Sequence, residues 1–222
     1  MAKASEQLAS WYLRLNGCLL IPNYIFHALD GRQRAEVDLL GVRFPYRAEM
    51  RDTGYILRDD TVFPEQPQVV DVVLGEVKAM KACTVNSSLL DATTHNMEYA
   101  LDALGVFPEA EQQGVADALR SSGAFANERY RVRLFAFGDS PNQQFSRRLP
   151  GAVQRTWPDV LAWILQRFTS RSSVLNYHDQ WDDFGQMLWR TARDGQANFF
   201  EAIHDELKRE AVEARGSAPE AE

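Results

Sequence analysis

The chain has 222 residues, of which 45% are hydrophobic and 25% are charged, and its formal net charge is −7 at pH 7. This length predicts one large domain, or one domain with an added helical part, and enough apolar residues for a sizeable core. The acidic balance excludes a wholly basic nucleic-acid coat protein. A local basic groove is still allowed, because phosphate binding depends on the patch and not on the total charge.

The two cysteines, Cys18 and Cys83, lie in no CxxC motif and no zinc-ligand spacing. We expect both to be reduced thiols that pack as small apolar groups. No run of 18 apolar residues is present to cross a membrane, and the first ten residues contain no apolar signal core. The sequence therefore predicts a cytoplasmic protein with no membrane partner.

The first predicted element is a helix over residues 4–16, closed by Gly17. One side of it carries an apolar stripe at helical spacing, formed by Leu8, Trp11, Tyr12 and Leu15. The opposite side carries Glu6, Ala9 and Leu13. A helix that is apolar on both sides is expected to be sandwiched between other elements, which would place Glu6 over packed neighbours.

Residues 18–29 and 34–44 are predicted to form a hairpin through the turn DGRQ, and Pro22 favours an edge position for the first strand. Residues 45–68 are rich in proline and glycine and are predicted to be an inserted loop. A third strand is predicted over residues 68–79.

The remaining predicted elements are, in chain order, helices at 87–105 and 108–123, a strand at 129–138, a polar loop at 139–155, and helices at 157–168, 180–192 and 197–214. Residues 215–222 are predicted to be a disordered tail. This order predicts an α/β core over residues 1–155 with a mixed central sheet, and a helical region over 156–214 that packs on or beside it.

The stretch VVLGEVKAMK carries opposite charges at the end of a buried strand, and Glu76 and Lys78 point to the same side because strand side chains alternate. Charges on a buried face are costly unless they are paired or bind a metal. Asp38 interrupts a second apolar strand, AEVDLLGV. If the two strands are antiparallel neighbours, Asp38 and Glu76 lie within a few ångströms of each other.

Carboxylates crowded in this way repel each other unless a cation lies between them. Mg²⁺ is commonly held by one or two carboxylates together with waters and a substrate phosphate. A lysine beside such a site can orient a water and offset the charge that develops on the phosphate. The pattern is therefore typical of metal-assisted phosphodiester hydrolysis.

The segments SEQLASWYLRLNG, AEVDLLGV and GEVKAMK, in a helix–strand–strand–strand–helix–strand order, resemble the PD-(D/E)xK nuclease superfamily. The nearest look-alikes are small archaeal Holliday-junction resolvases and YraN-like proteins, and the resemblance covers residues 4–138. It implies a restriction-endonuclease-like fold, with an added helical region, and a site for Mg²⁺ or Mn²⁺ formed by Asp38, Glu76 and the carbonyl of Val77.

The resemblance further implies that Lys78 is the catalytic lysine and that Glu6 assists through a water or a second metal ion. Candidate contacts to nucleic-acid phosphates are Lys81, Arg129, Arg131, Arg133, Arg147 and Arg148. Two alternatives stay open for these cations: Lys81 is simply solvated, or the arginines of 129–133 are the charged face of an edge strand.

The expected function is a metal-dependent nuclease that acts on DNA, in DNA repair or in defence against foreign DNA. One alternative is a catalytically inactive binding or scaffold subunit that kept the fold, since the acidic balance and the helical C-terminal third suit a protein partner. A second alternative is an RNA-processing enzyme with the same chemistry. The apolar stripes of the C-terminal helices would also allow a homodimer.

Overall fold

The computed structural model describes residues 3–27, 33–46, 58–63, 69–170 and 181–216. Its helices are α1 (Ala4–Leu15), α2 (Ser87–Leu90), the short 3₁₀ helix η2 (Ala92–Thr94), α3 (Asn96–Leu104), α4 (Glu109–Ser122), α5 (Gln143–Arg148), α6 (Trp157–Thr169), α7 (Asp183–Arg193) and α8 (Gln196–Gly216). Its strands are β1 (Leu19–His27), β2 (Gln33–Arg43), β3 (Val70–Val77), β4 (Ala124–Ala126), β5 (Tyr130–Gly138) and β6 (Val153–Thr156).

The strands form one open, mixed sheet in the order β1-β2-β3-β5-β4, and β6 also pairs with β5. The first three strands are antiparallel neighbours, whereas β3 and β5 run parallel, with helices in the connection between them. The predicted mixed α/β architecture is confirmed. The predicted hairpin and the edge position of the strand that contains Pro22 are also confirmed.

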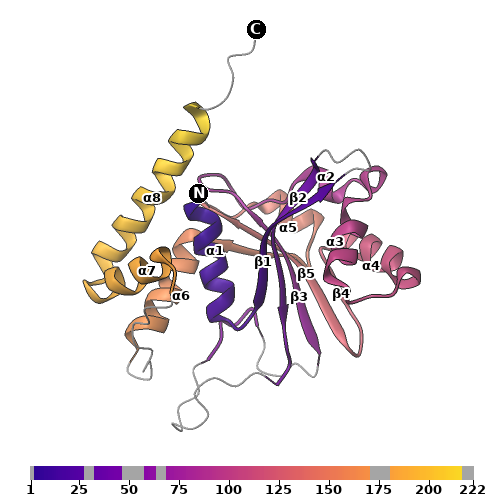
Figure 1. Ribbon diagram of the computed structural model, residues 1–222, viewed down its shortest axis with the longest axis horizontal. Coiled ribbons are helices and arrows are strands. Elements are labelled where there is room, and N and C mark those ends of the chain that lie inside the picture. The colour runs from indigo at the N-terminus through magenta and orange to yellow at the C-terminus, as the bar shows by residue number, and fades with distance from the viewer. Residues whose placement is uncertain (1–2, 28–32, 47–57, 64–68, 171–180, 217–222) are drawn as a thin grey trace.

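Helices cover both faces of the sheet (Figure 1). On one face α1 packs together with α6, α7 and α8 over apolar residues of β2, β3 and β5. On the other face α3 and α4 cover a second apolar cluster. The C-terminal helices turn their apolar stripe inward, since Phe199, Ile203 and Leu207 are fully buried.

Helix α1 is enclosed as the sequence predicted, and even Glu6 is only 6% exposed. Its N-terminus has no side-chain cap from the preceding residue, Lys3. Instead the carboxylate of Glu210, on α8, accepts hydrogen bonds from the backbone N–H of Ser5 at 2.8 Å and from its hydroxyl at 2.7 Å. A residue about 200 positions away thus caps the helix that carries Glu6.

Both cysteines are free and buried, as expected. Burial raises the pKa of Cys83 to about 11, so its thiol stays protonated and unreactive at neutral pH. In the described part of the chain, no helix combines the length and the hydrophobicity needed to cross a membrane.

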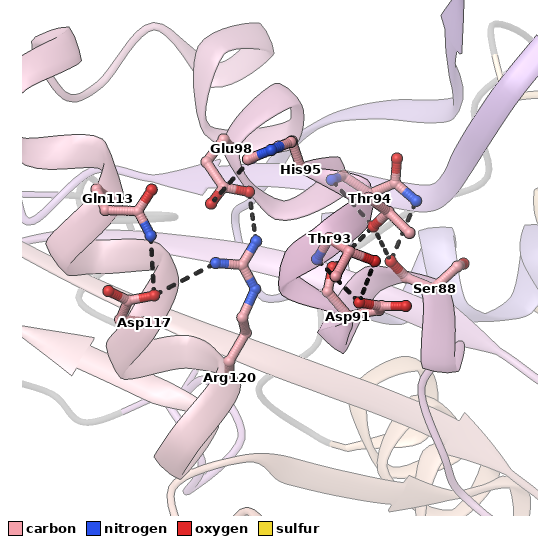
Figure 2. Close-up of polar contacts among 10 residues, drawn as sticks. Ser88, Asp91, Thr93, Thr94, His95, Glu98, Gln113, Asp117 and Arg120 are labelled. Carbon is pink, nitrogen blue, oxygen red and sulfur yellow. Dashed lines mark hydrogen bonds and ion pairs between the residues drawn. The ribbon is translucent and has the colours of Figure 1, made fainter.

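The single helix predicted over 87–105 is wrong. The segment breaks into α2, η2 and α3, because Asp91 accepts hydrogen bonds from the backbone N–H and the hydroxyl of Thr93, at 2.9 and 2.7 Å, and so starts a new turn (Figure 2). His95 then adopts a left-handed conformation with φ 55°. Local side-chain bonds of this kind compete with a continuous helix.

Two other predictions need correction. The loop predicted over 139–155 contains α5 and β6. Because β6 and the unpredicted β4 both pair with β5, β5 lies inside the sheet, and its arginines are not the charged face of an edge strand. Short strands of three or four residues carry too little alternation to stand out in a sequence.

Some predictions lie outside the described residues. These are the DGRQ turn up to residue 32, most of the loop predicted over 45–68, and the tail from residue 217 onward. Helix α8 itself extends to Gly216, two residues into the segment predicted to be a tail.

Candidate active site

The two strand carboxylates lie on neighbouring antiparallel strands. Leu39 of β2 pairs with Gly75 of β3, and continuing this register by one residue places Asp38 opposite Glu76. One Asp38 oxygen, Oδ2, accepts a hydrogen bond from the backbone N–H of Val77 at 2.7 Å. The sheet register therefore brings together the two residues that the sequence predicted to meet.

Glu76 is fully buried, and its two carboxylate oxygens have different surroundings. Oε2 lies 3.3 Å from the ammonium of Lys78, whereas Oε1 has no hydrogen-bond partner among the residues that the structure describes. Burial and, after it, the nearby charge of Asp38 raise the pKa of Glu76 to about 7, while Lys78 and the backbone N–H of Asn86 act in the opposite direction. Within the described residues, the site leaves one carboxylate oxygen without the compensation that burial demands.

The pKa of Asp38 is also raised, chiefly by burial. The Val77 N–H and the charge of Lys78 act in the opposite direction, while the negative charge of Glu6 adds to the increase. The protein thus disfavours the ionised form of both carboxyls, and one oxygen of Glu76 lacks a partner among the described residues. A small hard cation that takes oxygen ligands would stabilise the ionised forms and would fit this site. Together with a main-chain carbonyl they are a donor set of the kind such an ion takes.

Lys78 is half-buried and is fixed from two sides. Its ammonium contacts Oε2 of Glu76 and donates a hydrogen bond to Oδ1 of Asn86 at 2.8 Å. Asn86 stands at the N-terminus of α2. Sequence reasoning missed Asn86; the only available signal was an amide residue directly before a predicted helix.

Glu6 reaches the site from α1. It pairs with Lys3 at 2.6 Å, and this hydrogen bond is the main reason why the pKa of Lys3 is raised. The charges of Asp38 and Glu36 raise the pKa of Lys3 as well, so the helix and the strand carboxylates share one electrostatic environment. Sequence reasoning also missed Lys3 and Glu36. Charged residues near a chain terminus or in a polar part of a strand are common on protein surfaces, so their positions gave no signal.

No family model, curated protein or solved structure matches this chain. Across the described ranges, no group of three or more His, Cys, Asp or Glu side chains is placed to hold a metal ion. The donor set that the sequence predicts is smaller, with two carboxylates and one carbonyl.

The chain after Lys78 is held firmly against the end of the sheet. The indole N–H of Trp157 donates to the carbonyl of Ala79 at 2.5 Å, and the backbone N–H of Asp139 donates to the carbonyl of Lys81 at 2.7 Å. A Cβ at Gly138 would lie 2.5 Å from that same carbonyl, so glycine is needed for the close approach. These contacts fix the segment on which Lys78 and Lys81 stand.

The predicted phosphate contacts divide into three groups. Lys81, Arg147 and Arg148 are exposed, and they follow the carboxyl ends of β3 and β5, the end of the sheet where Lys78 lies. Arg129 is exposed at the opposite end, because it precedes Tyr130 at the start of β5. From the level of Val70 to that of Glu76 there are six residue steps, so Arg129 lies about 20 Å from the site along the sheet at ~3.3 Å per step.

Arg131 and Arg133 are not presented to solvent as the prediction required. Both guanidinium groups bind Asp71, a fully buried carboxylate, at 2.5 and 2.8 Å. Arg133 also donates to the carbonyl of Val62 at 2.7 Å. Because removing one partner of a buried ion pair leaves an uncompensated charge, these two arginines are committed to the core of the fold.

Proposed function

We propose that this protein is a metal-dependent nuclease that hydrolyses phosphodiester bonds of DNA on a restriction-endonuclease-like core. The observation that carries the proposal is the arrangement of Asp38 opposite Glu76, with Lys78 against one Glu76 oxygen and no described residue bonded to the other. The order of α1, three antiparallel strands, helices and the parallel strand β5 supports the same core.

In this proposal Asp38, Glu76 and the Val77 carbonyl would hold Mg²⁺ or Mn²⁺. Such an ion, when bound, stabilises negative charge on the phosphate and makes a bound water more acidic. The unpartnered Oε1 of Glu76 and the raised pKa of both carboxyls support this assignment.

Lys78 would act on the water and on the phosphate. Its ammonium, held between Glu76 and Asn86, is placed to orient the attacking water and to offset charge that develops on the phosphate oxygens. Glu6 keeps Lys3 beside the same site, and the exposed Lys81, Arg147 and Arg148 would bind phosphates of the flanking strand.

The test is cleavage of plasmid and branched DNA with Mg²⁺ or Mn²⁺. We expect Lys78→Ala and Glu76→Gln to lower the cleavage rate by at least about 10²- to 10³-fold, the usual cost of removing one group that stabilises charge in the transition state. Lys208→Ala is the matched control, because this exposed lysine lies on α8 and pairs with Asp205, three residues away on the same helix. Cleavage by Lys78→Ala at the wild-type rate would refute the proposal, and RNA of the same sequence tests the choice of substrate.

A further inference from the structure

Lys3 places an exposed ammonium at the N-terminus of α1, where a candidate site residue holds it. Its Nζ lies 2.6 Å from Oε1 of Glu6. The Lys3 side chain is 59% exposed, whereas that of Glu6 is only 7% exposed. An ammonium has three N–H donors, so when one of them is directed at Glu6 the others can still serve a ligand that arrives from solvent.

The pair of Lys3 and Glu6 lies beside the strand carboxylates. Glu6 and Asn23 line the same cavity between α1 and β1. The ladder pairs on either side of Asn23 place it opposite Asp38. At this point β1 bends, because Asn23 has a φ of 51°, a left-handed conformation instead of an extended one. Glu6 therefore approaches the candidate site from the side of β1.

The electrostatics agree with this placement. The hydrogen bond to Glu6 raises the pKa of Lys3 most, and the charges of Asp38 and Glu36 raise it as well, while burial lowers it. The charge of Glu6 in turn contributes to the raised pKa of Asp38. The ammonium of Lys3 is therefore charged at neutral pH, and it interacts with the carboxylate that faces Glu76.

Lys3 also lies at the end of the sheet that carries the candidate site. Figure 1 shows the N-terminus of α1 at the same end as α2 and α5, which come after the carboxyl ends of β3 and β5. Lys78 and the exposed Lys81, Arg147 and Arg148 lie on these segments. Lys3 thus adds a cation, from a different helix, to the end of the sheet where the substrate would bind.

The geometry of Glu6 does not favour the role of a metal ligand. In the described part of the chain, Glu6 does not join Asp38 and Glu76 in a group that could hold a metal ion. One of its oxygens is bonded to the Lys3 ammonium instead. The sequence predicted that Glu6 assists through a water or a second metal ion, and the contact with Lys3 offers a third way in which it can act.

We propose that Lys3 binds a phosphate of the substrate strand at the candidate site, and that Glu6 is the positioning residue of Lys3 and not the ligand of a second metal ion. The inference rests on the proposed nuclease function and adds a residue that contacts the substrate. Asp38 and Glu76 would then lie between two ammonium groups, with Lys78 on the Glu76 side and Lys3 on the Asp38 side. Two fixed ammonium groups beside one divalent ion can offset the charge that develops on the phosphate.

The main test measures how DNA binding depends on salt. Each phosphate that a protein cation neutralises contributes about −0.9 to the slope of log K against log salt concentration on duplex DNA, and about −0.7 on single strands. Binding of the full chain to duplex and single-stranded oligonucleotides is measured by fluorescence anisotropy in EDTA over a range of NaCl concentrations. Lys3→Gln removes the charge but keeps a donor for Glu6.

We expect Lys3→Gln to weaken binding at low salt and to make the slope on duplex DNA less negative by about 0.9. Lys3→Arg keeps the charge and should keep the wild-type slope. The matched control is Lys208→Gln, because Lys208 is 55% exposed and also pairs with a carboxylate three residues away, but on α8. A wild-type slope for Lys3→Gln, an equal change in Lys208→Gln, or no DNA binding by wild type would each overturn the inference.

Calorimetric titration with Mn²⁺ tests the role of Glu6. We expect wild type and Glu6→Gln to bind the same number of ions, a single ion per chain. Two ions bound by wild type and one by Glu6→Gln would make Glu6 a metal ligand and would overturn the inference.

The outcomes separate the two proposals. If wild type cuts DNA and the salt slope of Lys3→Gln is that of wild type, only the role of Lys3 is refuted. If wild type neither cuts DNA nor binds Mn²⁺, but Lys3→Gln loses one phosphate contact by its salt slope, only the nuclease assignment is refuted.

Discussion

A single buried carboxyl, Glu76, carries most of the chemistry that we assign to this protein. It is fully buried, faces Asp38 across two strands, and has the ammonium of Lys78 against one oxygen. Its pKa lies near 7, well above the ordinary value of 4.5. The folded protein therefore stabilises the protonated form of a group that the proposed function needs in its ionised form.

This shift predicts how stability depends on pH in metal-free buffer. Between about pH 4.5 and 7 the folded protein binds more protons at Glu76 than the unfolded chain does, so its free energy of unfolding falls as pH rises through that window. Above pH 7 the ionised carboxylate costs about 3 kcal/mol, from ~1.4 kcal/mol per pKa unit. Glu76→Gln does not titrate, and it should become the more stable protein as pH increases.

Urea unfolding in EDTA at pH 5 and pH 8 measures this effect. We expect the stability of Glu76→Gln relative to wild type to increase from pH 5 to pH 8. A difference that is the same at both pH values, or that has the opposite trend, would show that the pKa of Glu76 is not raised in the folded protein.

At the scale of elements, the position of α1 depends on α8. Glu210 satisfies both the backbone N–H and the hydroxyl of Ser5, which is 2% exposed. The same carboxylate lies at the positive end of the α1 dipole. The next residue of α1 is Glu6, so this contact helps to place a candidate site residue.

We expect Glu210→Ala to lower the free energy of unfolding by about 1–2 kcal/mol, since it removes a helix cap and leaves two buried donors unpaired. Glu210→Gln keeps an acceptor and should cost less. Denaturant unfolding of both, beside Glu201→Ala at an exposed position of the same helix, measures the difference. An equal loss in the alanine variants at 210 and 201 would contradict the capping role.

The sequence predicted those features of the elements that depend on local pattern. The apolar runs of the second and third strands were enough to place Asp38 and Glu76 on two buried strands. That the two residues face each other was predicted only on the condition that the strands are antiparallel neighbours, and this condition is met. Features that depend on sheet order were not accessible. The pairing of Asp71 with two arginines, 60 and 62 residues further along the chain, appears only once β3 and β5 are known to be neighbours.

Hydrogen bonds from side chains to the backbone, which can break a helix, were equally hard to predict from the sequence. The break of the predicted helix over 87–105 comes from the hydrogen bonds of Asp91, and nothing in the apolar spacing marks it. The partner of Lys78, Asn86, belongs to the same poorly patterned segment. The residue that holds Lys78 was therefore less predictable from the sequence than the two strand carboxylates.

At the scale of the whole molecule, the C-terminal helices complete the core that holds α1. Phe199, Ile203 and Leu207 of α8 belong to the same buried cluster as Leu8 and Tyr12 of α1. Burying three such side chains contributes about 5–9 kcal/mol, which is comparable with the total stability of a typical domain.

A chain that ends at Asp194 should therefore fail to fold, and the loss should extend to the sheet end that carries the candidate site. Circular dichroism and thermal unfolding of the truncated chain measure this. The triple substitution of Phe199, Ile203 and Leu207 by alanine, which keeps the chain length, is the companion variant. A truncated chain with the melting temperature of the intact protein would contradict this view of α8.

The bend at Asn23 has a consequence for how copies of this protein meet. β1 is an edge strand of nine residues, and its Leu19 and Ile21 are 67% and 49% exposed. A long, apolar edge strand of this kind can pair with other chains and lead to aggregation. Pro22 offers no N–H, and Asn23 departs from the extended conformation. The row of main-chain groups is thus interrupted near its middle, and a distortion beside the candidate site carboxylates also keeps the edge of the sheet from acting as a template for self-assembly.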